Sequence, residues 1–138
     1  MRVFLDTNVL VSAVATRGLC ADVLREVLLS HQLVISPPLL SELKNTLHTK
    51  IGIPQEIISD FLHLLTQDST LSENAELRNI DIHDTDDILI LSTAVSGNAE
   101  LFVTGDKELL GLEKIDTMGI VSPRQFWEKL KTQRPDEY

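Results

Sequence analysis

Four acidic residues stand where a chain of alternating strands and helices would bring them to one edge of a sheet. Asp6 directly follows the apolar run Arg2–Leu5, and Asp106 stands just beyond a second apolar run. Glu42 and Asp87 lie near the starts of two predicted helices. In a parallel sheet, strand ends and the starts of the following helices share one edge, and ligands bind there. We therefore expect these four carboxylates to meet.

Carboxylates gathered at one edge require a counter-charge. Like charges at close range disfavour full ionisation, so either some of the acids hold protons or a cation binds among them. A set made only of oxygen ligands suits Mg²⁺ or Mn²⁺ better than zinc. Such an ion can polarise a phosphoryl oxygen and lower the pKa of a bound water. The alternative is that each acid caps a helix or lies on a solvated surface.

Neutral and basic residues accompany the acids. Asn8 and Thr104 are placed to hydrogen-bond a ligating carboxylate or a water. Arg17, which precedes a glycine in a predicted loop, and Lys107, which follows Asp106, could contact a phosphate. An exposed loop arginine is the simpler interpretation of Arg17, so its role in binding is a hypothesis.

The third acid has alternative registers, because Asp84, Asp86 and Asp87 crowd the start of one predicted helix. Carboxylates favour a helix N-terminus, so Asp84 can simply be the cap. Asp87 lines up with Leu91 one turn further on, whereas Asp86 points further from the apolar face. We therefore assign Asp87 to the site and keep Asp84 and Asp86 as alternatives.

Sequence patterns predict the elements that would position these residues. Short apolar, partly β-branched runs predict strands at Arg2–Leu5, Leu33–Ser36, Leu101–Thr104 and Gly119–Val121, with a weaker one within Asp68–Glu73. Amphipathic stretches between them predict helices, including one near Leu19–Ser30. Another runs from the Ser36–Pro37 helix start to about Thr49. Thr7 or Asn8 is expected to cap the first helix.

The alternation of strands and helices indicates a parallel sheet covered on both faces. We therefore predict the α/β class, with a three-layer α/β/α sandwich around a central parallel sheet. We expect a single domain over residues 1–131 and a polar C-terminal tail over residues 132–138.

Composition narrows the class of protein. The chain has 138 residues, of which 43% are hydrophobic but only 4% aromatic, so the core must be aliphatic. The single cysteine, Cys20, excludes an intrachain disulfide and a Cys-rich zinc site, which suits the cytoplasm. Asp6 interrupts the first apolar stretch, and no uncharged run approaches the ~20 residues of a membrane span, so neither a signal peptide nor a membrane segment is expected.

The net charge of -9 has two interpretations. Taken alone, it argues against a nucleic-acid-binding protein, which usually carries a basic face. One interpretation is a solvated acidic surface. The other is that several acids are gathered at a metal site, where a divalent cation reverses the local sign and presents a phosphate backbone with positive charge.

The ordered set of motifs resembles the PIN domain, over nearly the whole chain from Met1 to about Leu130. The resemblance rests on Asp6-Thr7-Asn8, Ser36-Pro37 with Glu42, Asp87 at the start of an Ile/Leu/Ala helix, and Val103-Thr104-Gly105-Asp106. The segment Val121–Phe126 is also similar to a bacterial, toxin-like (VapC-like) branch of that family.

This resemblance implies a Mg²⁺- or Mn²⁺-dependent endoribonuclease that hydrolyses phosphodiester bonds of single-stranded RNA. It implies the toxin of a toxin–antitoxin pair, acting as a homodimer held by an antitoxin protein. By position, the metal-binding and catalytic acids would be Asp6, Glu42, Asp87 and Asp106, supported by Asn8 and Thr104. Candidates for RNA contacts are Arg17, Lys44, Lys50 and Lys107.

Besides a DNA-directed or structure-specific nuclease with the same chemistry, two other functions fit parts of the sequence. One is a receiver-like signalling module with an acidic pocket and a phosphorylated aspartate. It needs an aspartate at the end of a strand in mid-chain, which is missing, and Asp106-Lys107 imitates its late lysine poorly. The other is a PIN fold that binds partners without cutting, against which the intact set of four acids argues.

Overall fold

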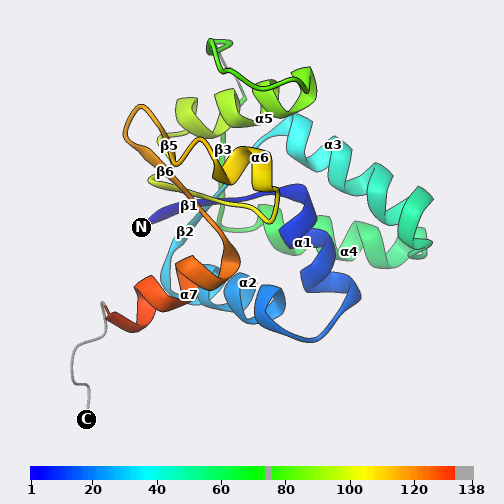
Figure 1. Ribbon diagram of the computed structural model, residues 1–138. Coiled ribbons are helices and arrows are strands. Elements are labelled where there is room, and N and C mark those ends of the chain that lie inside the picture. Colours follow the sequence, from blue (N-terminus) through cyan, green and yellow to red (C-terminus); the bar gives the residue numbers. More distant parts are fainter. Residues whose placement is uncertain (74–75, 133–138) are drawn as a thin grey trace.

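The computed structural model describes residues 1–73 and 76–132, which form a sheet enclosed by helices (Figure 1). The strands are β1 (Arg2–Leu5), β2 (Gln32–Ile35), β3 (Thr70–Leu71), β4 (Leu101–Val103), β5 (Lys114–Ile115) and β6 (Met118–Val121). The helices are α1 (Thr7–Ala15), α2 (Leu19–Ser30), α3 (Pro37–Thr46), α4 (Gln55–Thr66), α5 (Thr85–Ser96), α6 (Lys107–Leu110) and α7 (Pro123–Thr132). The π-helical turn η1 (Leu47–Ile51) continues α3.

The sheet has the strand order β3-β2-β1-β4-β6-β5. All neighbouring strands are parallel except β5 and β6, which are antiparallel. From β1 the chain adds β2 and β3 on one side and then returns to add β4 and β6 on the other. The direction of winding therefore reverses between β1 and β4, which is where open α/β sheets bind their ligands.

Helices cover both faces of the sheet, which confirms the predicted three-layer α/β/α sandwich. In Figure 1, α5 lies on one side of the strands, and α2 and α7 lie on the opposite side. The α5 helix is held to the end of β3 by a hydrogen bond from the Ser72 hydroxyl to the Thr93 carbonyl oxygen, 2.7 Å long. Gly97, at its C-terminus, lets it approach β2, because a Cβ there would stand 2.7 Å from Val34 Cγ1.

The core is mainly aliphatic, as the composition predicts, and two of its few aromatic rings lie at the centre of the sheet. Phe4 on β1 and Phe102 on β4 are fully buried and stack with ring centroids 5.2 Å apart. Because these strands pair directly, the stack fixes the register Phe4 to Phe102. Asp6 and Thr104 are the residues that directly follow β1 and β4, so the same register places them together at the carboxyl ends of the two central strands.

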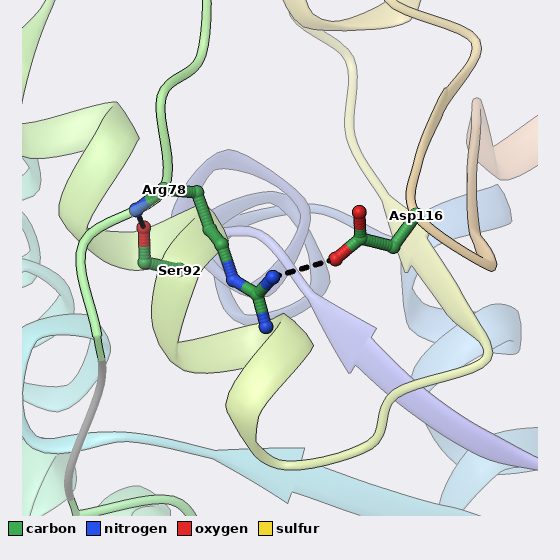
Figure 2. A network of polar contacts seen from close by, with 3 residues as sticks. All are labelled: Arg78, Ser92 and Asp116. Atoms are coloured by element: carbon green, nitrogen blue, oxygen red, sulfur yellow. Dashed lines mark hydrogen bonds and ion pairs between the residues drawn. The ribbon is translucent and has the colours of Figure 1, made fainter.

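The irregular segment before α5 is tied to both the helix and the edge of the sheet (Figure 2). The Arg78 amide donates to the Ser92 hydroxyl on α5 over 3.0 Å, and the Arg78 guanidinium pairs with Asp116 over 2.7 Å. Asp116 lies in the turn between β5 and β6. Both partners of the ion pair are partly exposed, so it contributes at most about 1 kcal/mol and serves mainly to orient the segment.

Three local predictions need correction. The edge strand β5 and its antiparallel pairing were not expected. The predicted long helix after Ser36 is α-helical only to Thr46 and then widens into η1, which ends at Gly52 in the left-handed conformation. The cap of α1 is the Asp6 carboxylate rather than a side chain of Thr7 or Asn8. By contrast, the predicted helix at Leu19–Ser30 and the weak strand before Glu73 are present.

Two further expectations concern the C-terminal tail and the absence of a membrane-spanning segment. The polar tail expected from residue 132 lies outside the described residues, apart from Thr132 at the end of α7. Within residues 1–73 and 76–132, no single helix is long and apolar enough to cross a membrane. In the part of the chain that the structure describes, one pair of helices, α1 and α2, has the required length and composition when taken together, and this pair is bent by 107°.

Candidate functional site

An open cleft of about 630 Å³ lies at the carboxyl ends of the central strands. Its acidic lining residues are Asp6, Glu42, Asp84, Asp86, Asp87 and Asp106. Its other walls come from α1, from the end of α3 and from η1, which contributes Lys50. We call this the acidic cleft. The four acids predicted from the sequence therefore lie around one cavity, at the point where the winding of the sheet reverses.

Asp6 is the most buried acid of the cleft, with 6% of its surface exposed. Its amide donates to the Val103 carbonyl oxygen over 2.9 Å, which extends the pairing of β1 and β4 by one residue. One carboxylate oxygen accepts a 2.8 Å hydrogen bond from the Thr7 amide and thereby caps α1. The other accepts a 2.7 Å hydrogen bond from the Thr104 hydroxyl. Both oxygens are thus held at fixed positions.

Thr104 connects Asp6 to Asp106. Its hydroxyl is fully buried, donates to Asp6 and accepts the Asp106 amide over 3.0 Å. A hydroxyl has one proton, so accepting from the Asp106 amide leaves that proton for Asp6. The Asp106 carboxylate in turn caps α6 by accepting from the Glu108 amide over 2.8 Å. The end of β4 therefore orients two acids through one threonine.

The three aspartates at the start of α5 differ in position. Asp84 is the N-cap, and one of its oxygens accepts from the amides of Asp86 at 2.8 Å and Asp87 at 3.4 Å. Asp84 and Asp86 are exposed, whereas Asp87 is half-buried. All three line the acidic cleft. Asp87 is therefore the most buried of the three aspartates, while Asp84 and Asp86 lie at the rim of the acidic cleft.

Burial and mutual repulsion perturb two of these acids. Burial raises the pKa of the Asp6 carboxyl, the hydrogen bonds from Thr104 and Thr7 oppose this, and the charges of Glu42 and Asp106 add to it. Burial also raises the pKa of Asp87 to about 7, together with the negative charges of its acidic neighbours Asp84, Asp6, Asp106 and Glu42. The acids are therefore close enough to repel one another.

The remaining predicted residues lie at different distances from the cleft. Asn8 lines it, and its side-chain oxygen accepts a 3.3 Å hydrogen bond from the Gly105 amide, next to Asp106. Arg17 and Lys107 are exposed and are not among its lining residues. Lys50 is the basic residue that lines it, and the π-helical turn brings it there.

Thr7 was not among the predicted site residues, although it lines the cleft. It is 5% exposed, and its hydroxyl oxygen is buried without a hydrogen-bond partner. A buried hydroxyl without a protein partner is costly, because burial removes its hydration. Sequence analysis missed this residue because it read Thr7 as a possible helix cap, whereas Asp6 performs that role.

The donor set of the cleft has the chemistry that Mg²⁺ or Mn²⁺ requires, because carboxylate and amide oxygens predominate. The carboxylates are not drawn together, however: among residues 1–73 and 76–132, no group of three or more His, Cys, Asp or Glu side chains is arranged to hold a metal ion. The residues therefore fit a hard cation by type and by location, with side chains that must converge on it.

The comparison with families of known sequence decides the classification. Residues 2–108 match the family model described as the PIN domain. The chain belongs to the PIN domain family. The match covers β1 through the start of α6, and it therefore includes every acid of the cleft. PIN domains are typically nucleases.

The PIN fold is also found in a solved structure that the chain resembles, the crystal structure of VapBC2 from Rickettsia felis bound to a DNA fragment from their promoter. The two chains are 21% identical, with a TM-score of 0.64, and the similarity covers 88% of this chain and 98% of the other. No curated protein matches the sequence.

The strand order argues against the receiver-like alternative. In the receiver type of doubly wound sheet, β1 lies between the second and third strands of the chain. Here β1 pairs with β2 and β4. The hypothesis of a receiver-like signalling module is therefore inconsistent with the strand order, whereas both the sequence and the fold support the PIN domain.

Proposed function

We propose that this PIN domain is a Mg²⁺- or Mn²⁺-dependent endoribonuclease. The observation that carries the proposal is the gathering of Asp6, Glu42, Asp87 and Asp106 around one cleft at the point where the sheet reverses its winding. Their repulsion, expressed in the raised pKa values of Asp6 and Asp87, is relieved when a cation binds.

These four acids would hold the metal, which would supply a nucleophilic water and neutralise charge on the phosphate. The chain's own contribution is orientation. Thr104 fixes one oxygen of Asp6 and the backbone of Asp106, and the cap of α1 fixes the other oxygen of Asp6. Asn8 joins α1 to the loop before Asp106. Lys50, with Arg17 and Lys107 further out, offers positive charge to the RNA backbone.

The biological setting is part of the same proposal. The similar Rickettsia felis structure is of VapBC2 with promoter DNA. This similarity supports an antitoxin protein as the partner. We propose with it a toxin role in which single-stranded RNA is the substrate and the chain forms a homodimer in the cytoplasm. We propose one domain over residues 1–131 for this activity. A non-catalytic PIN fold that binds partners is the alternative.

Metal titration with a labelled single-stranded RNA tests the proposal. Cleavage is expected only with Mg²⁺ or Mn²⁺, and Asp6→Asn is expected to abolish it while the circular dichroism spectrum stays that of the wild type. Asp60→Asn, an exposed aspartate on α4, is the matched control and is expected to cleave normally. Undiminished cleavage by Asp6→Asn would refute the site. Metal binding without cleavage would favour the non-catalytic alternative.

A further inference from the structure

A second groove, of about 460 Å³, opens between α3 and α5. It shares Glu42, Asn45 and Asp86 with the acidic cleft, so the two cavities are continuous. Its other walls are Pro38, Ser41, Leu89 and Ile90. We call it the side groove. A ligand that extends past the acids of the acidic cleft can therefore place its next group in the side groove.

The lining of the side groove is unsuited to phosphate. No lysine, arginine or histidine is among its lining residues, while Glu42 and Asp86 repel anions. Leu89, with 37% of its surface exposed, and the half-buried Pro38 offer apolar surface. The exposed Ser41 and Asn45 add a hydroxyl and an amide. Apolar surface beside a neutral donor and acceptor is what an unstacked nucleobase requires for its face and its edge.

The acidic cleft and the side groove are therefore continuous but differ in the polarity of their linings. Lys50 lines the acidic cleft but not the side groove, so the positive charge that it offers to the RNA backbone belongs to the acidic cleft. We propose that the side groove binds the nucleobase next to the scissile phosphate, with the Asn45 amide hydrogen-bonding its edge and Leu89 contacting its face. This inference rests on the proposed ribonuclease function.

The inference gives the preference for single strands a physical cause. Inside a duplex, both faces of a base are stacked and its pairing edge is occupied. Only an unpaired nucleotide can turn its base between α3 and α5 while its phosphate stays among the acids. The volume of the groove, about 460 Å³, lies within the range of small-molecule sites.

Abasic substitution tests the role of the base directly. A labelled single-stranded RNA that the protein cleaves is compared with copies in which one nucleotide on either side of the cut lacks its base. Loss of the base on one side is expected to lower kcat/KM about tenfold. In Asn45→Ala and in Leu89→Ala this penalty is expected to fall below about threefold, since those variants have already lost the contacts with the base.

Two variants outside the site serve as matched controls. Gln55→Ala removes an exposed amide on α4, and Leu29→Ala removes a leucine that is 75% exposed on α2. Both are expected to keep the full abasic penalty. Binding of the same RNAs is measured in parallel by fluorescence anisotropy, so that the side groove is tested even without cleavage.

The outcomes separate this inference from the proposed function. Cleavage without an abasic penalty, or with the same penalty in Asn45→Ala and Leu89→Ala, overturns the side groove as a base site and leaves the nuclease standing. Binding that depends on the base and on Asn45, without cleavage, supports the base site and overturns the nuclease. Neither cleavage nor base-dependent binding overturns both.

Discussion

Replacing Asp87 with asparagine is expected to stabilise the metal-free protein. Asp87 is half-buried among acids that raise its pKa from 3.8 to about 7. An acid whose pKa is higher in the folded state holds its proton more tightly there than in the unfolded chain. Stability is therefore lost as the pH rises through this window, and the whole loss is present above pH 7. Asparagine has no charge to repel and removes the loss.

The size of the effect follows from the displacement of the pKa. At about 1.4 kcal/mol per pH unit, the full displacement would correspond to about 4 kcal/mol. Asp87 is partly exposed, so solvent screening reduces this to about 1–2 kcal/mol. A carboxylate in the first turn of α5 also interacts favourably with the helix dipole, and asparagine forfeits about 0.3–1 kcal/mol of that. Repulsion outweighs the dipole, and the melting temperature should rise by about 2–6 °C at pH 8.

Thermal unfolding in EDTA at a series of pH values measures this difference. The gap between Asp87→Asn and the wild type should be widest at pH 8 and shrink as the pH is lowered to 5. Asp86→Asn is the control, because Asp86 lies in the same helical turn but is exposed. It loses the dipole interaction without relieving comparable repulsion. An Asp87→Asn variant no more stable than the wild type at pH 8, or a gap independent of pH, would refute the reasoning.

Three further substitutions probe the polar contacts and packing around the site, each measured by thermal or urea unfolding without metal. Thr7→Val replaces a buried hydroxyl that has no partner, so it should raise the free energy of unfolding by about 1 kcal/mol, whereas Thr7→Ser should not. Thr104→Val leaves an Asp6 oxygen and the Asp106 amide without their partner, so it should lower the free energy of unfolding by about 2–4 kcal/mol. Gly97→Ala forces a Cβ to within 2.7 Å of Val34 Cγ1, so it should lower the free energy of unfolding by about 1–3 kcal/mol. An unchanged unfolding midpoint would mean that α5 can move away from β2.

The strands that carry the acids were predictable because their sequence signals are local. Phe4 and Phe102 lie in short apolar runs that end abruptly in polar residues, and burial on both faces produces such runs in parallel strands. Once the strands are parallel, Asp6 and Thr104 must reach the same edge. Helical periodicity distinguished Asp87 from Asp86 in the same way, and Asp87 is the more buried of the two.

Other features depend on conformations that composition does not signal. Glu113 and Asp116 both have positive φ, at 62° and 52°, and the short hairpin of β5 and β6 is built around them. Neither residue is a glycine, so the sequence carries little warning of this turn. Lys50 was one of several candidate cations, and its place in the cleft depends on a π-helical turn that α-helical spacing does not describe. The unpaired Thr7 hydroxyl depends on packing around the start of α1.

The two outermost strands of the sheet have a consequence for how this chain can associate with other proteins. The edge strands, β3 and β5, contain two residues each. Exposed edges usually invite another chain to continue the sheet, but strands this short offer too few free backbone groups to hold an added strand in register. Recognition by strand addition is therefore disfavoured at both ends of the sheet. The side chains of the helical surfaces are the better candidates for recognition by a second subunit or another protein.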